Sequence, residues 1–191
     1  MNLPNKLTVA RIIATPFFMF AMIASFKGNF IVALVLFIAA SLTDMLDGKI
    51  ARKYNLVTDF GKFLDPLADK MLTTSAFLGF LWFDICPGIV WIVFIVLFRE
   101  FMITSLRLVA VGSGRVIAAN MWGKAKTVSQ MAAIILTLLV LAVKSVVALP
   151  DTVVWVTDIV VAVALWASAV LTVISGIIYM IDNKDCIDHT K

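Results

Sequence analysis

The stretch from residue 30 to residue 70 reads FIVALVLFIAASLTDMLDGKIARKYNLVTDFGKFLDPLADK. It opens with an unbroken apolar run and continues into a segment that contains five aspartates. An apolar run of this kind is typical of a helix in a membrane or in a buried core. Carboxylates near such a helix are costly unless a cationic group lies among them. The stretch therefore predicts a membrane helix with an acidic end that faces a cation.

The rest of the chain has the composition of an integral membrane protein. Of the 191 residues, 62% are hydrophobic, and the mean hydropathy is +1.05, whereas soluble domains are about half apolar. The apolar run at 153–181 is long enough to cross a bilayer, which takes roughly 20 helical residues. We predict an all-α integral membrane protein, folded as one membrane domain over residues 1–191.

Apolar segments separated by Gly, Pro, Asn and Asp predict a bundle of six transmembrane helices. The predicted helices span 7–26, 30–53, 62–83, 87–110, 126–148 and 152–181.

The basic residues predict the orientation of this bundle. With the N-terminus in the cytoplasm, only Lys27 and Lys144 of the 16 Lys and Arg residues fall towards the outer side. Such a bias is the positive-inside pattern of membrane proteins. An even number of spans then places both termini in the cytoplasm, and we predict a multi-pass protein of the cell membrane.

Four of the aspartates are spaced as pairs on helix faces. Asp44 and Asp47 are three residues apart at the end of the second predicted helix, and Asp65 and Asp69 are four apart at the start of the third. Both spacings put two side chains on one face of a helix. Close carboxylates repel each other, and hard oxygen ligands suit Mg²⁺, Mn²⁺ or Ca²⁺. Four of them can hold two divalent cations about 4 Å apart, as in displacement at phosphorus.

The alternative is a belt of interfacial charges without metal. In that interpretation the acids pair with neighbouring bases, namely Arg52, Lys53, Lys62 and Lys70. Asp59 differs from the four, because it precedes the third helix and is placed as an N-cap.

Glycines beside the acids favour a binding site over a charge belt. Gly48 follows the first pair and Gly61 opens the next helix. A glycine inside a helix costs about 1 kcal/mol relative to alanine, so Gly48 indicates a bulky group against the helix backbone. Arg52 is then a natural partner for a phosphate or a base edge.

Together these residues form the pattern D-x2-D-G-x2-A-R-x8-G-x3-D-x3-D. The pattern resembles the signature of the CDP-alcohol phosphatidyltransferase family at every fixed position. Its fixed positions are Asp44, Asp47, Gly48, Ala51, Arg52, Gly61, Asp65 and Asp69.

The resemblance implies a fold and a reaction. Members are six-helix membrane proteins, usually homodimers, with the active site at the cytoplasmic face. They transfer a phosphatidyl group from CDP-diacylglycerol to an alcohol and release CMP, by metal-assisted attack of the alcohol on the β-phosphorus. No nucleic-acid partner is implied.

The same resemblance assigns roles to single residues. The four paired aspartates would hold two cations, Mg²⁺ or Mn²⁺, and Asp69 would also be the general base. The residues that would contact the CDP moiety are Asn5, Thr8, Gly48, Arg52 and Gly61. For Asn5 and Thr8, ordinary capping of a helix start is the alternative.

A cluster of basic residues predicts an anionic acceptor alcohol. Its members are Arg107, Arg115, Lys124 and Lys126. The strings LPNKLTVARI, REFMITSLR and WGKAKT look like those of family members that use sn-glycerol 3-phosphate, whose phosphate would bind to this cluster. Members that use inositol phosphate are the close alternative, and positive-inside topology alone also places basic residues here. Arg99 and Glu100 fit a buried structural pair as well as a site.

A divalent-cation transporter is the distant alternative. Transporter sites usually lie near the bilayer midplane in broken helices. Here the paired acids crowd one membrane face, and the far halves of the helices carry little that continues a pathway.

Overall fold

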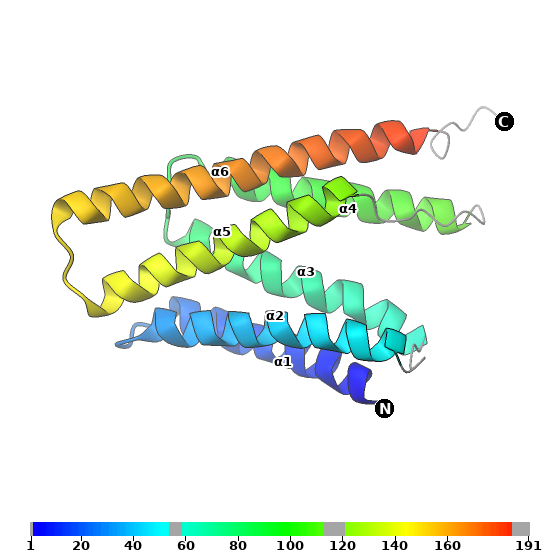
Figure 1. Ribbon diagram of the computed structural model, residues 1–191, viewed down its shortest axis with the longest axis horizontal. Helices are drawn as coiled ribbons and strands as arrows, with labels where there is room; N and C mark the ends of the chain where they lie inside the picture. Colours follow the sequence, from blue (N-terminus) through cyan, green and yellow to red (C-terminus); the bar gives the residue numbers. More distant parts are fainter. Residues whose placement is uncertain (1, 54–58, 113–120, 185–191) are drawn as a thin grey trace. The chain divides into compact units, whose positions relative to one another are not determined.

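The computed structural model describes residues 2–53, 59–112 and 121–184 (Figure 1). Within these ranges the side chains of residues 3–4, 45–53, 59–63, 65 and 111–112 lie outside the description. The described residues form six helices and no strand, which confirms the all-α prediction. The helices are α1 (Leu3–Ile23), α2 (Asn29–Lys53), α3 (Asp59–Trp82), α4 (Ile89–Gly112), α5 (Met121–Val146) and α6 (Asp151–Asp182).

Four of these helices are membrane-spanning by length and composition. In the described part of the chain they correspond to Asn5–Ile23, Ile89–Ala110, Met121–Val146 and Asp151–Asp182. The described apolar stretch of α2 is Asn29–Asp44, and α3 begins with acidic and basic residues. The prediction of six helices is confirmed, whereas six membrane crossings and cytoplasmic termini stay predictions.

Large apolar side chains on the helix surfaces fit a lipid environment. Phe17 and Phe20 of α1, Phe98 and Phe101 of α4, and Trp155 of α6 are all exposed. Large apolar side chains are costly to expose to water in such number, whereas lipid chains accept them without penalty. The described helices therefore have surfaces suited to a bilayer.

The start of α1 is set by a cap rather than by the apolar run. The side chain of Asn2 accepts a hydrogen bond from the backbone N–H of Asn5 at 3.3 Å, and Pro4 lies in the first turn. Both features are typical of helix N-termini. The helix consequently begins at Leu3 instead of residue 7, and Asn5 and Thr8 lie inside it.

The described residues divide into two compact units, and the prediction of a single domain stays a prediction. The first unit lies within Met1–Phe83 and Ile134–Thr157, and the second within Asp84–Ala133 and Asp158–Lys191. Each unit has its own buried core.

In the first unit α1 packs against both α2 and α3, and α1 and α2 lie side by side (Figure 1). The rings of Phe18 and Phe37 meet at a centroid distance of 5.7 Å between α1 and α2. Gly79 of α3 faces Met22 of α1, and a β-carbon at position 79 would lie 2.6 Å from Cε of Met22, so the end of this flexible side chain would have to move. Asn29, at the start of α2, donates to the carbonyl of Met22 at 3.4 Å. These contacts fix α1 between its two neighbours.

In the second unit α4 packs against α6. Ile103 and Leu106 of α4 form a buried cluster with Tyr179 of α6. At the start of α4, the indole N–H of Trp166 donates to the carbonyl of Pro87 at 3.2 Å. Gly88 next to it has φ +77°, a left-handed conformation that glycine adopts at little cost.

Candidate active site

The first pair of predicted metal ligands lies on one continuous helix. Positions 44 and 47 belong to α2, about one turn apart. The side chain of Asp44 is 45% exposed and forms an ion pair with the guanidinium of Arg11 from α1. The side chain of Asp47 lies outside the described residues. The predicted partners of the acids did not include Arg11, whose only signal in the sequence was a charge inside an apolar run.

The second pair lies near the start of α3. Asp69 is exposed, and its backbone carbonyl accepts a hydrogen bond from Thr73 at 3.2 Å. Pro66 lies inside the helix between Asp65 and Asp69. Proline removes one backbone N–H from the helical hydrogen bonds, so the helix is locally weakened between the two acidic positions.

The convergence of all four acids stays a prediction. Among the described side chains, no group of three or more His, Cys, Asp or Glu lies together, and Asp44 and Asp69 are the two of the four that are described. Three of the predicted CDP contacts also have surroundings outside the described residues. They are Gly48 and Arg52 in α2 and Gly61 in α3.

One face of α1 carries a row of buried polar side chains. Asn5, Thr8, Arg11 and Thr15 are all buried, and they recur every three or four residues, the spacing of a single helix face. Because Asn2 caps the helix, capping does not account for Asn5 and Thr8. Asn5 and Thr8 lie on the same face as Arg11, which contacts Asp44. This position favours a binding role for both residues, which stays a prediction.

The predicted acceptor residues have different surroundings in the second unit. Arg107 donates from Nε to Oη of Tyr179 at 2.9 Å, and its guanidinium lies 5.5 Å from the centre of the same ring. Lys124 is exposed at the start of α5. Arg115 lies outside the described residues. Tyr179 was not among the predicted site residues, because 72 positions separate it from its partner.

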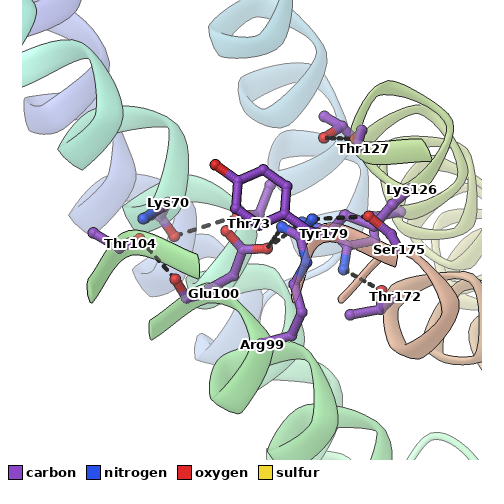
Figure 2. Close-up of polar contacts among 12 residues, drawn as sticks. Lys70, Thr73, Arg99, Glu100, Thr104, Lys126, Thr127, Thr172, Ser175 and Tyr179 are labelled. Carbon is purple, nitrogen blue, oxygen red and sulfur yellow. Dashed lines mark hydrogen bonds and ion pairs between the residues drawn. The ribbon is translucent and has the colours of Figure 1, made fainter. Parts of the chain in front are cut away.

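Lys126 belongs to a buried network of charges (Figure 2). Its ammonium pairs with Oε1 of Glu100 on α4. Glu100 also accepts from Nη1 of Arg99 at 3.1 Å, and Nη2 of Arg99 donates to Ser175 of α6 at 2.9 Å. The network ties α4, α5 and α6 together, and Arg99, which is buried, pairs with the partly buried Glu100, in line with the structural interpretation of these two residues. The role of Lys126 at the acceptor phosphate stays a prediction.

Among the described residues the cysteine is Cys86, and its surroundings lower the reactivity of its thiol. It lies in the turn between α3 and α4 and is buried. Burial, and to a smaller extent the carboxylate of Asp84, raises the pKa of the thiol above its usual value. The thiol therefore stays protonated at neutral pH and is a poor nucleophile.

Comparisons with known proteins agree with the signature at residues 44–69. A family model described as CDP-alcohol phosphatidyltransferase matches residues 1–174. The chain therefore belongs to the CDP-alcohol phosphatidyltransferase family.

Individual relatives match along nearly the whole chain. One is the CDP-diacylglycerol--glycerol-3-phosphate 3-phosphatidyltransferase of Bacillus subtilis, 42% identical over 198 residues that cover 97% of each protein. The Rickettsia bellii protein of the same name is 38% identical and covers 93% of each. A probable phosphatidylglycerophosphate synthase of Mycobacterium tuberculosis is 37% identical, over 94% of this chain and 80% of the relative.

Proposed function

We propose that this protein transfers the phosphatidyl group of CDP-diacylglycerol to sn-glycerol 3-phosphate. The products are phosphatidylglycerophosphate and CMP. The observation that carries the proposal is similarity over nearly the full length to relatives whose names state this reaction, together with a complete family signature at residues 44–69. The protein is therefore a transferase of phospholipid biosynthesis.

The reaction is a displacement at the β-phosphorus of CDP-diacylglycerol. A hydroxyl oxygen of glycerol 3-phosphate forms a new bond to this phosphorus, and the bond to the oxygen of CMP breaks. CMP leaves with the electron pair, and the hydroxyl proton passes to Asp69. The exposed position of Asp69 on α3 suits a base that meets a water-soluble acceptor. A general base of this kind typically contributes about 10²–10⁴-fold to the rate.

Asp44, Asp47, Asp65 and Asp69 would hold two divalent cations, Mg²⁺ or Mn²⁺. The two described members fit this task, because both present hard oxygen donors on accessible side chains. Bound cations would neutralise negative charge on the diphosphate and on the departing CMP.

The CDP moiety is assigned to residues on three helices. These are Asn5 and Thr8 of α1, Gly48 and Arg52 of α2, and Gly61 of α3. Support comes from α1, where Asn5 and Thr8 lie on the same buried polar face as the partner of Asp44. A polar row of this kind is suited to a nucleotide, which needs hydrogen-bonding partners rather than charge alone.

The acceptor phosphate is assigned to Arg107, Arg115, Lys124 and Lys126. Tyr179 orients Arg107 through a hydrogen bond at 2.9 Å, and a fixed guanidinium suits a phosphate. Lys124 is exposed and can meet a solute directly. Lys126 already pairs with Glu100, so a phosphate would have to compete with this carboxylate.

The active site is assigned to the cytoplasmic face of the cell membrane, in a homodimer. The support for the orientation is the distribution of Lys and Arg. At that face the acyl chains stay in the bilayer while the headgroup reaches the paired aspartates. Water-soluble glycerol 3-phosphate approaches from the cytoplasm.

The test uses purified protein in detergent with CDP-diacylglycerol and Mg²⁺ or Mn²⁺. CMP release is followed with glycerol 3-phosphate, inositol phosphate, inositol or serine as the acceptor. We expect release with glycerol 3-phosphate alone. Release with inositol phosphate instead would overturn the acceptor assignment and keep the reaction class. If no acceptor supports release, flux of Mg²⁺ or Mn²⁺ into liposomes tests the transporter alternative.

A further inference from the structure

Arg11 is a buried charge in α1, a helix with a mainly apolar sequence. Its side chain is 1% exposed, whereas the side chain of its partner Asp44 is 45% exposed. A cation at membrane depth is costly and is kept where it pairs with an acid or serves a function. A charge needed only for topology would lie at the surface, as Lys6 does on the same helix.

The contact between Arg11 and Asp44 joins α1 to α2 in the first unit. Nη1 of Arg11 donates to Oδ1 of Asp44, a residue 33 positions away. The carbonyl of Arg11 accepts from Oγ1 of Thr15 at 2.9 Å, and Thr8 and Thr15 flank it on the buried polar face. The guanidinium is therefore presented from a packed helix, and its planar shape restricts the orientation of the carboxylate that it binds.

This contact leaves Asp44 able to bind a cation. A carboxylate has two oxygens with about four acceptor directions, and Arg11 engages Oδ1. The side chain stays nearly half exposed. Arg11 thus holds the carboxylate from its buried side and leaves its exposed side accessible.

We propose that Arg11 is the positioning residue of Asp44, which fixes this carboxylate in the orientation that takes a divalent cation. The proposal rests on the function proposed above. Hydrogen-bond partners of metal ligands commonly account for about 10–100-fold in metal affinity.

The direction in which cation affinity changes when Arg11 is replaced distinguishes a positioning role from a simple counter-charge role. Removing a nearby cation lowers electrostatic repulsion, so a simple counter-charge predicts tighter binding of a dication after its removal. Positioning predicts weaker binding, because the carboxylate then samples several rotamers. Replacement by lysine keeps the charge but loses the planar guanidinium.

The experiment titrates Mn²⁺ into the full-length protein in detergent, without lipid substrate, and follows free Mn²⁺ by electron paramagnetic resonance. The variants are Arg11→Met, Arg11→Lys and the matched control Lys6→Met, which removes one exposed charge from the same helix. We expect Arg11→Met to raise the Kd for Mn²⁺ by about 10–100-fold, Arg11→Lys to raise it less, and Lys6→Met to leave it unchanged.

Size-exclusion chromatography and thermal unfolding establish that each variant is folded. If Arg11→Met does not fold, Arg11→Lys decides alone, because a counter-charge role predicts wild-type affinity for it and positioning predicts weaker binding. Unchanged or tighter Mn²⁺ binding in the folded variants would overturn the proposal.

CMP release separates this outcome from failure of the proposed function. If the wild type releases CMP and the Arg11 variants bind Mn²⁺ as it does, the positioning role fails and the function stands. In a folded Arg11→Met protein we expect the lost rate to recover as Mn²⁺ is raised. A wild type that neither binds Mn²⁺ nor releases CMP would contradict both.

Discussion

Asp69 lies on α3 with an exposed side chain, and the proposed reaction gives it the proton of the acceptor. We predict that Asp69→Asn abolishes turnover, since an amide cannot take that proton. CDP-diacylglycerol should still bind in the presence of metal. Single-turnover CMP release measures the first property, and binding of a labelled lipid measures the second.

A matched control for this substitution is Asp84→Asn, which changes an exposed aspartate in the turn between α3 and α4. We expect wild-type turnover from it. Unimpaired turnover in Asp69→Asn would remove Asp69 as the base.

Arg107 belongs to the proposed acceptor site and is oriented by Tyr179. We predict that Arg107→Ala raises KM for glycerol 3-phosphate by about tenfold or more, since hydrogen bonds to charged groups contribute about 1.5–3 kcal/mol. KM for CDP-diacylglycerol should change little. Steady-state kinetics with each substrate varied in turn give both constants.

Tyr179→Phe provides a graded comparison, because it removes the hydroxyl that Arg107 contacts at 2.9 Å and keeps the ring. We expect a smaller rise in the same KM. Equal increases in both KM values for Arg107→Ala would indicate a general disturbance of the site instead.

The partners of charged side chains on other helices were the part of the site that the sequence did not predict. The spacing of the acids predicted Asp44 as a cation ligand, but its ion pair with Arg11 bridges 33 positions. The pair of Lys126 with Glu100 bridges 26. Helical spacing relates residues three or four apart, so contacts between different helices depend on packing that no local pattern encodes.

At the element scale, the charge network of Arg99, Glu100, Lys126 and Ser175 connects three helices (Figure 2). We predict that Glu100→Gln destabilises the protein by about 3–5 kcal/mol, because it leaves two buried cations without their carboxylate. The measurement is the unfolding free energy in detergent, from denaturant titration followed by tryptophan fluorescence.

The double variant Glu100→Gln with Lys126→Met isolates the ion pair. The double variant should regain part of the lost stability, because Lys126, one of the two cations left without a carboxylate, has been removed. Thr104→Val, one turn along α4 and exposed, is the control and should stay near wild-type stability. A Glu100→Gln protein as stable as the wild type would show that the network carries no stability.

Helix number was predictable from the sequence, and helix ends were less so. Apolar segments and the loop residues between them predicted six helices, and six are present among the described residues. The ends differ because caps and flanking polar turns extend a helix beyond its apolar part. Asn2 starts α1 at Leu3, and α5 begins at Met121, before the predicted residue 126.

At the scale of the whole molecule, the distribution of basic residues predicts the orientation in the membrane. We predict that a green fluorescent protein fused to the C-terminus of the full chain is fluorescent in bacterial cells, whereas alkaline phosphatase at the same place is inactive. Both results follow if the C-terminus lies in the cytoplasm. Active phosphatase would contradict the predicted topology.

The crossing of the membrane by α2 and α3 stays a prediction. Among the described residues, length and hydropathy identify the other four helices as candidate spans, and the apolar stretch of α2 is described over Asn29–Asp44. Packing supports the prediction, because α1, itself a candidate span, contacts both α2 and α3.

Product analysis tests the proposed formation of phosphatidylglycerophosphate. Purified protein is incubated with CDP-diacylglycerol, isotope-labelled glycerol 3-phosphate and Mg²⁺, and the lipids and nucleotides are quantified by mass spectrometry. We expect labelled phosphatidylglycerophosphate and CMP in equal amounts, and neither product from Asp69→Asn. CMP without the labelled lipid, or no product from folded wild-type protein with either Mg²⁺ or Mn²⁺, would contradict it.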